Sequence, residues 1–166
     1  MTMPESTYRD LMHRTITNYE FVRDNAQKDG PYEVTQLVNS FVAVVGYPRE
    51  RAIGDLLKAV SIEKGRDLGL PPIPVISSNP NYRADSVADQ ATMLRNAAAH
   101  GRIKFSADEN SRQIGAITFS DENRARDQRT SIALTIETVE QILYAFRNIA
   151  EYLFQQASQL NKTQVG

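Results

Sequence analysis

Three side chains that can act on a phosphate lie close together in the middle of the chain: Arg95, Asn96 and His100. An arginine guanidinium can hold a phosphate through parallel hydrogen bonds, and a histidine can transfer a proton near neutral pH. On an α-helix, Asn96 and His100 share a face because they are four residues apart, and the long side chain of Arg95 reaches the adjacent strip. The spacing therefore predicts that the three side chains can converge on one phosphate.

The same residues also fit a purely structural interpretation. Arginine and asparagine are common on the solvent side of a helix, and a histidine near a helix C-terminus interacts favourably with the last carbonyls. The local charge favours the chemical interpretation, because residues 90–106 contain Arg95, His100, Arg102 and Lys104 without any Asp or Glu. This cationic segment lies in a chain whose formal net charge is -1.

The local sequence predicts that the motif occupies the last turns of a helix. Ser86 or Asp85 can cap the start of this helix, and Gly101 is suited to its end. Between them, apolar residues recur at helical spacing, at Val87, Ala91, Leu94 and Ala98. The small side chains at 97–99 favour the helix and allow a second helix or a nucleic-acid backbone to approach closely.

The segment after the motif helix is expected to form a short β-hairpin. Apolar residues, Phe105 among them, alternate with Arg102 and Lys104 and are followed by a polar turn at 108–111. The apolar face is expected to pack on the helices. Arg102 and Lys104 then either extend the cationic segment beside the motif or are simply solvated. The Asp121–Glu122 pair is expected in a polar turn after the hairpin.

The remaining elements are expected to be helices, from apolar residues at a helical period. They are expected over 6–29, 32–46, 49–64 and 130–158. Residues 65–80 hold four of the seven prolines and are expected to form a long connector. The expected fold class is therefore mainly α: a helical bundle of about five helices with a short β-hairpin after the motif helix.

The composition limits the possible chemistry. With 166 residues, of which 41% are hydrophobic, the chain fits one domain over 1–166 with a frayed tail at 159–166. The absence of cysteine excludes thiolate catalysis and cysteine zinc sites, and His13 and His100 alone are too few for a His-rich metal centre. No metal and no cofactor are expected. A cytoplasmic location without membrane contact is expected, because no long apolar run or secretory signal occurs.

The segment 95–100, Arg-Asn-Ala-Ala-Ala-His, resembles the RNxxxH motif of the HEPN superfamily, helical prokaryotic proteins that act on RNA. Residues 31–40 and 47–50 are similar to the upstream helix of one HEPN group, which is typified by a plasmid-encoded toxin-like protein. Residues 94–105 are similar to the motif helix of that group and the strand that follows it. The resemblance extends over most of the chain, roughly 14–154.

The resemblance implies a homodimer in which the two motif helices face each other and form a composite cleft with two arginines and two histidines. Active members cleave RNA without a metal, through attack of the ribose 2′-OH, and leave 2′,3′-cyclic phosphate and 5′-OH ends. The implied roles are acid or base for His100, phosphate clamp for Arg95, and positioning of His100 or a phosphate oxygen for Asn96. Arg102 and Lys104 are expected to bind RNA. A toxin or defence effector fits this activity.

Two other functions remain open at this point. A catalytically silent HEPN domain would bind RNA or supply a dimerisation surface, and a plain helical adaptor would carry the motif by coincidence. In some HEPN proteins a nucleotidyltransferase partner modifies a tyrosine two positions after the histidine. Arg102 stands there in this chain, which puts that form of control in doubt. An antitoxin partner that acts by another route remains possible.

Overall fold

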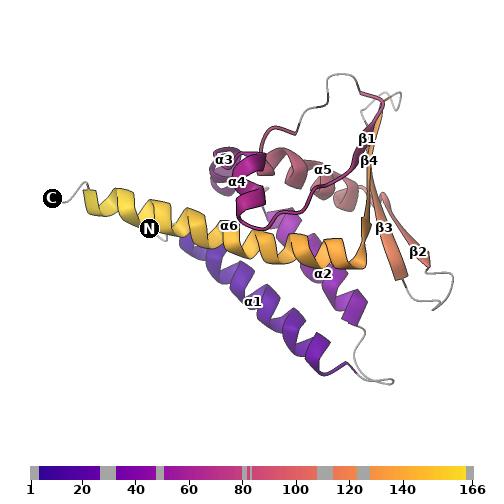
Figure 1. Cartoon of the computed structure of the whole chain (residues 1–166), viewed down its shortest axis with the longest axis horizontal. Helices are drawn as coiled ribbons and strands as arrows, with labels where there is room; N and C mark the ends of the chain where they lie inside the picture. The colour runs from indigo at the N-terminus through magenta and orange to yellow at the C-terminus, as the bar shows by residue number, and fades with distance from the viewer. Residues whose placement is uncertain are drawn as a thin grey trace.

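The computed structural model of the chain describes residues 4–26, 33–47, 51–79, 82, 84–107, 114–122 and 128–163. Within these residues, a group of helices abuts one face of a small sheet (Figure 1). The helices are α1 (Pro4–Asp24), α2 (Glu33–Gly46), α3 (Arg51–Lys58), α4 (Ile62–Asp67), α5 (Val87–Ala99) and α6 (Ile136–Thr163). The strands are β1 (Val75–Ser77), β2 (Ile103–Ala107), β3 (Ile114–Glu122) and β4 (Arg129–Thr135). The expected mainly α fold class is confirmed.

The core lies between α1, α2, α5, α6 and the sheet. On α1, residues spaced three or four apart are buried, and the same spacing buries a stripe of α6 that packs along α1. The α1 residues are Tyr8, Met12, Ile16 and Tyr19. The helix expected over 32–46 is α2, in which Leu37, Phe41, Val44 and Val45 are buried. Among the described residues, no helix is long and apolar enough to cross a membrane.

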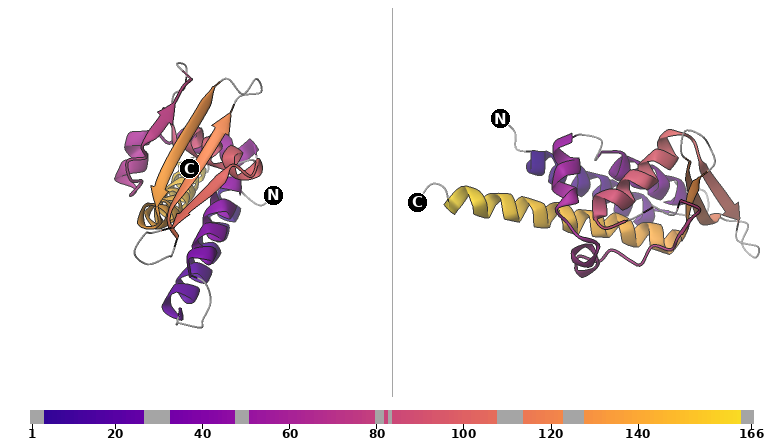
Figure 2. Two further views of the ribbon diagram at one scale, coloured as in Figure 1. Left: turned by 90° about the vertical axis from the view of Figure 1, so that its right-hand side faces the viewer. Right: turned by 90° about the horizontal axis from the view of Figure 1, so that it is seen from above.

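The sheet has the strand order β1-β4-β3-β2, and its strand pairs are antiparallel. Figure 2 shows α6 nearly end-on behind the sheet, so the helices meet the sheet through one face. The Phe41 ring of α2 lies 5.3 Å from the Phe119 ring of β3, measured between ring centroids. The predicted hairpin is confirmed as β2 and β3, although it is only half of the sheet, and its predicted turn at 108–111 lies outside the described residues.

The hairpin differs from its prediction in two places. Phe105 was expected to pack on the helices but is 53% exposed, because β2 is the edge strand of the sheet that the described residues form. The predicted turn at Asp121–Glu122 is wrong, since both residues belong to β3 and pair with β4.

Residues 130–135, predicted to begin the last helix, belong to β4 instead. Thr130, Ile132 and Leu134 are buried in strict alternation, and β4 is hydrogen-bonded to a strand on each side. The helix begins only at Ile136, after Thr135 accepts a hydrogen bond at 3.1 Å from the backbone N–H of Thr138. The helix also continues to residue 163, past the tail predicted to fray from 159.

Three other boundaries also differ from their predictions. The helix predicted over 49–64 is two helices, because the Ser61 side chain caps α4 by accepting from the backbone N–H of Lys64 at 3.1 Å. The connector predicted over 65–80 contains the end of α4 and the short strand β1, which pairs with β4. Helix α1 ends at Asp24 rather than at 29, and residues 27–29 lie outside the described residues.

Candidate functional site

The first turn of α5 is held by a reciprocal pair of hydrogen bonds. The Ser86 hydroxyl accepts from the backbone N–H of Asp89 at 3.3 Å, and the Asp89 carboxylate accepts from the backbone N–H of Ser86 at 2.9 Å. This capping box satisfies two backbone donors that the helix leaves without partners. Of the two residues predicted to cap this helix, Ser86 and Asp85, Ser86 is the cap.

The other end of α5 closes through its backbone alone. His100 is the first residue past the helix, and Gly101 takes a φ of 64°, a left-handed conformation that glycine adopts without strain. The N–H of Gly101 bonds to the carbonyl of Ala98 at 3.1 Å, and that of Arg102 bonds to Ala97 at 2.8 Å. These two bonds form a Schellman motif, which confirms Gly101 as the helix stop.

The structure brings the three motif residues to this end of α5. Arg95 and Asn96 are half-buried on the last turn, and His100 is exposed just beyond it. Among the described residues, no hydrogen bond or ion pair engages the side chain of Arg95 or His100. The three alanines between them differ, because Ala97 is fully buried, Ala98 is half-buried and Ala99 is exposed.

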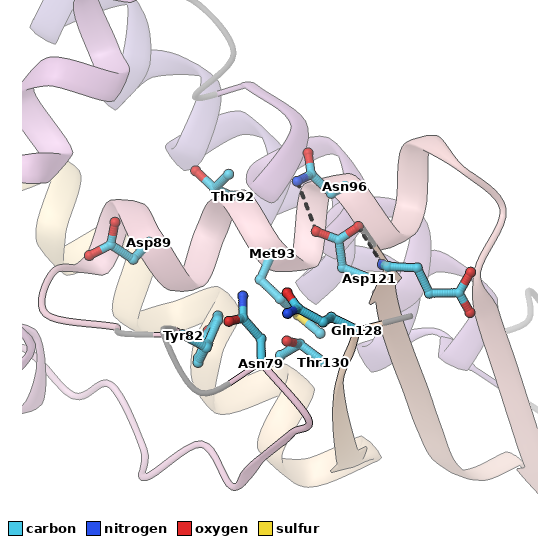
Figure 3. Close-up of a pocket in the computed structure, with 10 residues that line it drawn as sticks. Asn79, Tyr82, Asp89, Thr92, Met93, Asn96, Asp121, Gln128 and Thr130 are labelled. Atoms are coloured by element: carbon cyan, nitrogen blue, oxygen red, sulfur yellow. Dashed lines mark hydrogen bonds between the residues drawn. The ribbon is translucent and has the colours of Figure 1, made fainter. Parts of the chain in front are cut away.

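Asn96 is engaged by the sheet. Its side-chain amide donates to Asp121 Oδ2 of β3 at 3.0 Å (Figure 3), so the amide N–H is directed toward β3. Asp121 follows Ile117 and Phe119 at alternate positions on the strand, and both of those residues are buried. The side of β3 that packs on the helices therefore ends in a carboxylate aimed at α5.

The two cationic residues after the motif lie in different environments. Arg102 Nη1 lies 3.5 Å from Asp121 Oδ1, and Arg102 Nη2 lies 3.6 Å from Glu122 Oε2. Lys104 is exposed on β2, and within the described part of the chain it makes no ion pair. The carboxylates that offset the charge of Arg102 come from β3, about twenty residues further along the sequence.

A pocket of about 290 Å³ lies beside α5, between the helix, the end of β3 and the residues Asn79 and Tyr82. We call it the α5 pocket. Its lining residues with a carboxylate or an amide are Asn79, Asp89, Asn96, Asp121, Glu122 and Gln128. Figure 3 shows Met93 of α5 extending toward Gln128 and Thr130, with Tyr82 beside Asn79. The pocket is thus polar around a small apolar centre.

Three carboxylates line the α5 pocket, and Arg102 offsets the charge of two of them, Asp121 and Glu122. Burial raises the pKa of the Tyr82 hydroxyl, and the charges of Asp89 and then Asp121 raise it further. Among the described residues, no group of three or more His, Cys, Asp or Glu is arranged to hold a metal ion. The sequence prediction missed this pocket. The alternation of Ile117 and Phe119, continued to Asp121, was the available signal for one of its carboxylates.

Comparisons with known proteins point to one description. The family model described as HEPN pEK499 p136 matches residues 1–157. No curated protein and no solved structure matches this chain significantly.

Proposed function

The chain belongs to the HEPN pEK499 p136 family, and on this premise we propose that it is a metal-independent endoribonuclease of a toxin or defence type. Family membership supports an RNA-related or toxin-type module. The observation that carries the finer proposal is the end of α5. There Arg95 and His100 lie on the last turn and at the helix cap, and no hydrogen bond or ion pair among the described residues employs their side chains.

The proposed reaction needs proton transfer and a fixed positive charge. One imidazole removes the proton of the ribose 2′-OH, which attacks the adjacent phosphorus, and an imidazolium protonates the departing 5′ oxygen. The products are a 2′,3′-cyclic phosphate and a 5′-OH. His100 supplies the proton transfer, which is typically worth about 100- to 10,000-fold in rate, and Arg95 offsets the charge that builds on the phosphoryl oxygens.

The proposal includes a homodimer with the two α5 helices facing each other. One motif contains a single histidine, whereas the reaction uses both a base and an acid, so a second copy completes the pair. The exposed Ala99 lies between Arg95 and His100 and has little bulk to keep another helix away. RNA then binds across the shared cleft, and exposed Lys104 adds positive charge beside it.

The test compares two histidine variants on a mixed RNA in the presence of EDTA. We expect wild-type protein and His13→Ala to cleave and leave cyclic phosphate ends, and His100→Ala to lose cleavage by at least about 100-fold. His13 is the matched control because it is an exposed histidine on α1, away from the motif. Cleavage that requires added Mg²⁺, or equal cleavage by both variants, would contradict the proposal.

The catalytically silent HEPN domain is the second candidate, and one observation favours it. Asp121 and Glu122 offset the charge of Arg102 beside the motif, which weakens the attraction for a polyanion. RNA binding or dimerisation without cleavage in the same EDTA assay would support this candidate. If the chain is instead the proposed nuclease, an antitoxin partner would act on the α5 face rather than through a modified tyrosine, because Arg102 stands two positions after His100.

A further inference from the structure

The α5 pocket has the size and lining of a site for one small planar group. Its volume of about 290 Å³ lies at the lower limit of typical small-molecule sites, which begin near 300 Å³. Three separate parts of the chain form it, namely α5, the β3–β4 end of the sheet, and the two residues Asn79 and Tyr82. It therefore depends on the tertiary fold and is not a feature of one loop.

The lining selects against a phosphate and in favour of a ligand with N–H donors. Asp89, Asp121 and Glu122 contribute carboxylates, which only accept hydrogen bonds when ionised. Asn79 and Gln128 carry amides that both donate and accept. A simple cation would use acceptors alone, whereas this mixture suits a heterocycle that carries donors and acceptors on one edge.

The carboxylate of Asp89 is already oriented by the fold. The hydrogen bonds that the described residues make to this side chain come from Asp85, from the backbone of Ser86 and from its hydroxyl, and all of them end on Oδ2. The other oxygen, Oδ1, accepts none of these bonds. Asp89 can thus offer an acceptor to the pocket without giving up its role in the cap.

We propose that the α5 pocket binds one base of the RNA substrate and that guanine fits it best. This inference rests on the proposed function. Among the bases, guanine presents two adjacent donors, N1–H and N2–H, beside the acceptor O6. Asp89 Oδ1 can accept from one of these donors, and an amide of Asn79 or Gln128 can donate to O6. The ring of Tyr82 and the side chain of Met93 supply apolar contact for the base.

The position of the pocket couples it to the motif. The pocket extends along α5 from Asp89 to Asn96, seven residues or about 10 Å of helix, and Asn96 is next to Arg95. That length is comparable to the span of a nucleotide from the edge of its base to its phosphate. A base held in the pocket therefore places its ribose and phosphate near Arg95 and His100, and the pocket selects the nucleotide at which the chain is cut.

The test measures binding of nucleoside 3′-monophosphates by calorimetry, with His100→Ala as the background so that no RNA chemistry intervenes. We expect guanosine 3′-monophosphate to bind at least about tenfold more tightly than the adenosine, cytidine or uridine compounds. Thr92→Phe fills the pocket from an exposed α5 position, and Asp89→Asn replaces one acceptor with a donor. Both variants are expected to lose the preference. Thr17→Phe, the same change at an exposed site on α1, is expected to keep it.

The outcomes separate this inference from the proposed nuclease. Equal binding of all four nucleotides, or a guanine preference that survives Thr92→Phe in a folded protein, would overturn the base pocket. Tighter binding of arginine amide, with displacement of the nucleotide, would also overturn it and indicate a site for a cationic protein side chain. Guanine-selective binding without RNA cleavage would support the pocket and contradict the nuclease. Cleavage without base preference and without nucleotide binding would support the nuclease and contradict the base pocket.

Discussion

The two ends of α5 are closed by different means. At the first end the side chains of Ser86 and Asp89 bond to the backbone, and Ser86 is only 8% exposed. At the second end backbone bonds at Gly101 close the helix, while the side chains of Arg95 and His100 take no part among the described contacts. Side chains therefore close the first end of α5. At the second end the backbone closes the helix, and the side chains of Arg95 and His100 are not needed for it. Substitutions at the two ends should therefore separate stability from activity.

The largest effect, on RNA cleavage, is expected from Arg95→Ala at the C-terminal end of α5. Loss of the guanidinium should lower RNA cleavage about 100- to 1,000-fold, because it removes a preorganised group that meets the transition-state charge. The melting temperature should remain within about a degree of wild type, since no described contact depends on this side chain. Cleavage kinetics and a thermal melt on the same preparation measure both quantities.

The matched control for Arg95→Ala is Arg14→Ala on α1. Arg14 is exposed and pairs with Asp10 one turn away, a contact of small energetic value. This variant should cleave and melt like wild type. If Arg95→Ala instead lowered the melting temperature by several degrees while cleaving normally, the assignment of stability to the first end of α5 and of activity to the second would be wrong.

A smaller effect, on stability and not on cleavage, is expected from Ser86→Ala. Removal of the cap should lower the free energy of unfolding by about 1 kcal/mol. The backbone N–H of Asp89 loses its acceptor, and the Asp89 carboxylate loses the hydrogen bond from the hydroxyl. For a chain of this size that loss of free energy lowers the melting temperature by about 2 to 4 °C. Cleavage per folded molecule should be unchanged, and Ser86→Thr, which keeps the hydroxyl, should recover much of the stability. A stable Ser86→Ala variant without activity would contradict this assignment.

The smallest effect is expected from Lys104→Ala, set against Arg102→Ala. Loss of exposed Lys104 should weaken RNA binding a few-fold and reduce the salt dependence by about one phosphate contact, without a change in stability. Arg102 already pairs with Asp121 and Glu122, so its removal should shift RNA affinity less and lower stability slightly. Binding titrations at several salt concentrations distinguish the two. A larger loss of affinity for Arg102→Ala would show that its ion pairs open to RNA.

The features that could be predicted from the sequence depend on residues that are close together along the chain. The cap at Ser86 and the stop at Gly101 follow from side-chain chemistry within one helical turn, and both are confirmed. The contact between Asn96 and Asp121 joins residues 25 positions apart, and the pairing of Arg102 with the same carboxylate is also distant in sequence. No local pattern encodes such pairs, so neither the offset of the Arg102 charge nor the α5 pocket could be predicted.

The missed strand β4 has a different cause. Ile132 precedes Ile136 by four residues, so the apolar spacing of α6 continues across the boundary and imitates a longer helix. The competing alternation of Thr130, Ile132 and Leu134 spans only five residues and becomes decisive through pairing with β1 and β3. Tertiary hydrogen bonding therefore overrode the local pattern.

The three alanines before His100 face three surroundings, and so they differ in the substitutions they can accept. Position 97 is enclosed by the core and leaves no volume for a larger side chain, whereas position 98 is half covered and position 99 opens to solvent. In a randomised library, selection for folding alone would thus constrain position 97 and leave position 99 diverse. If selection for toxicity reduced the range of residues accepted at position 99, a second surface would have to lie against α5, because folding of the monomer sets no limit there.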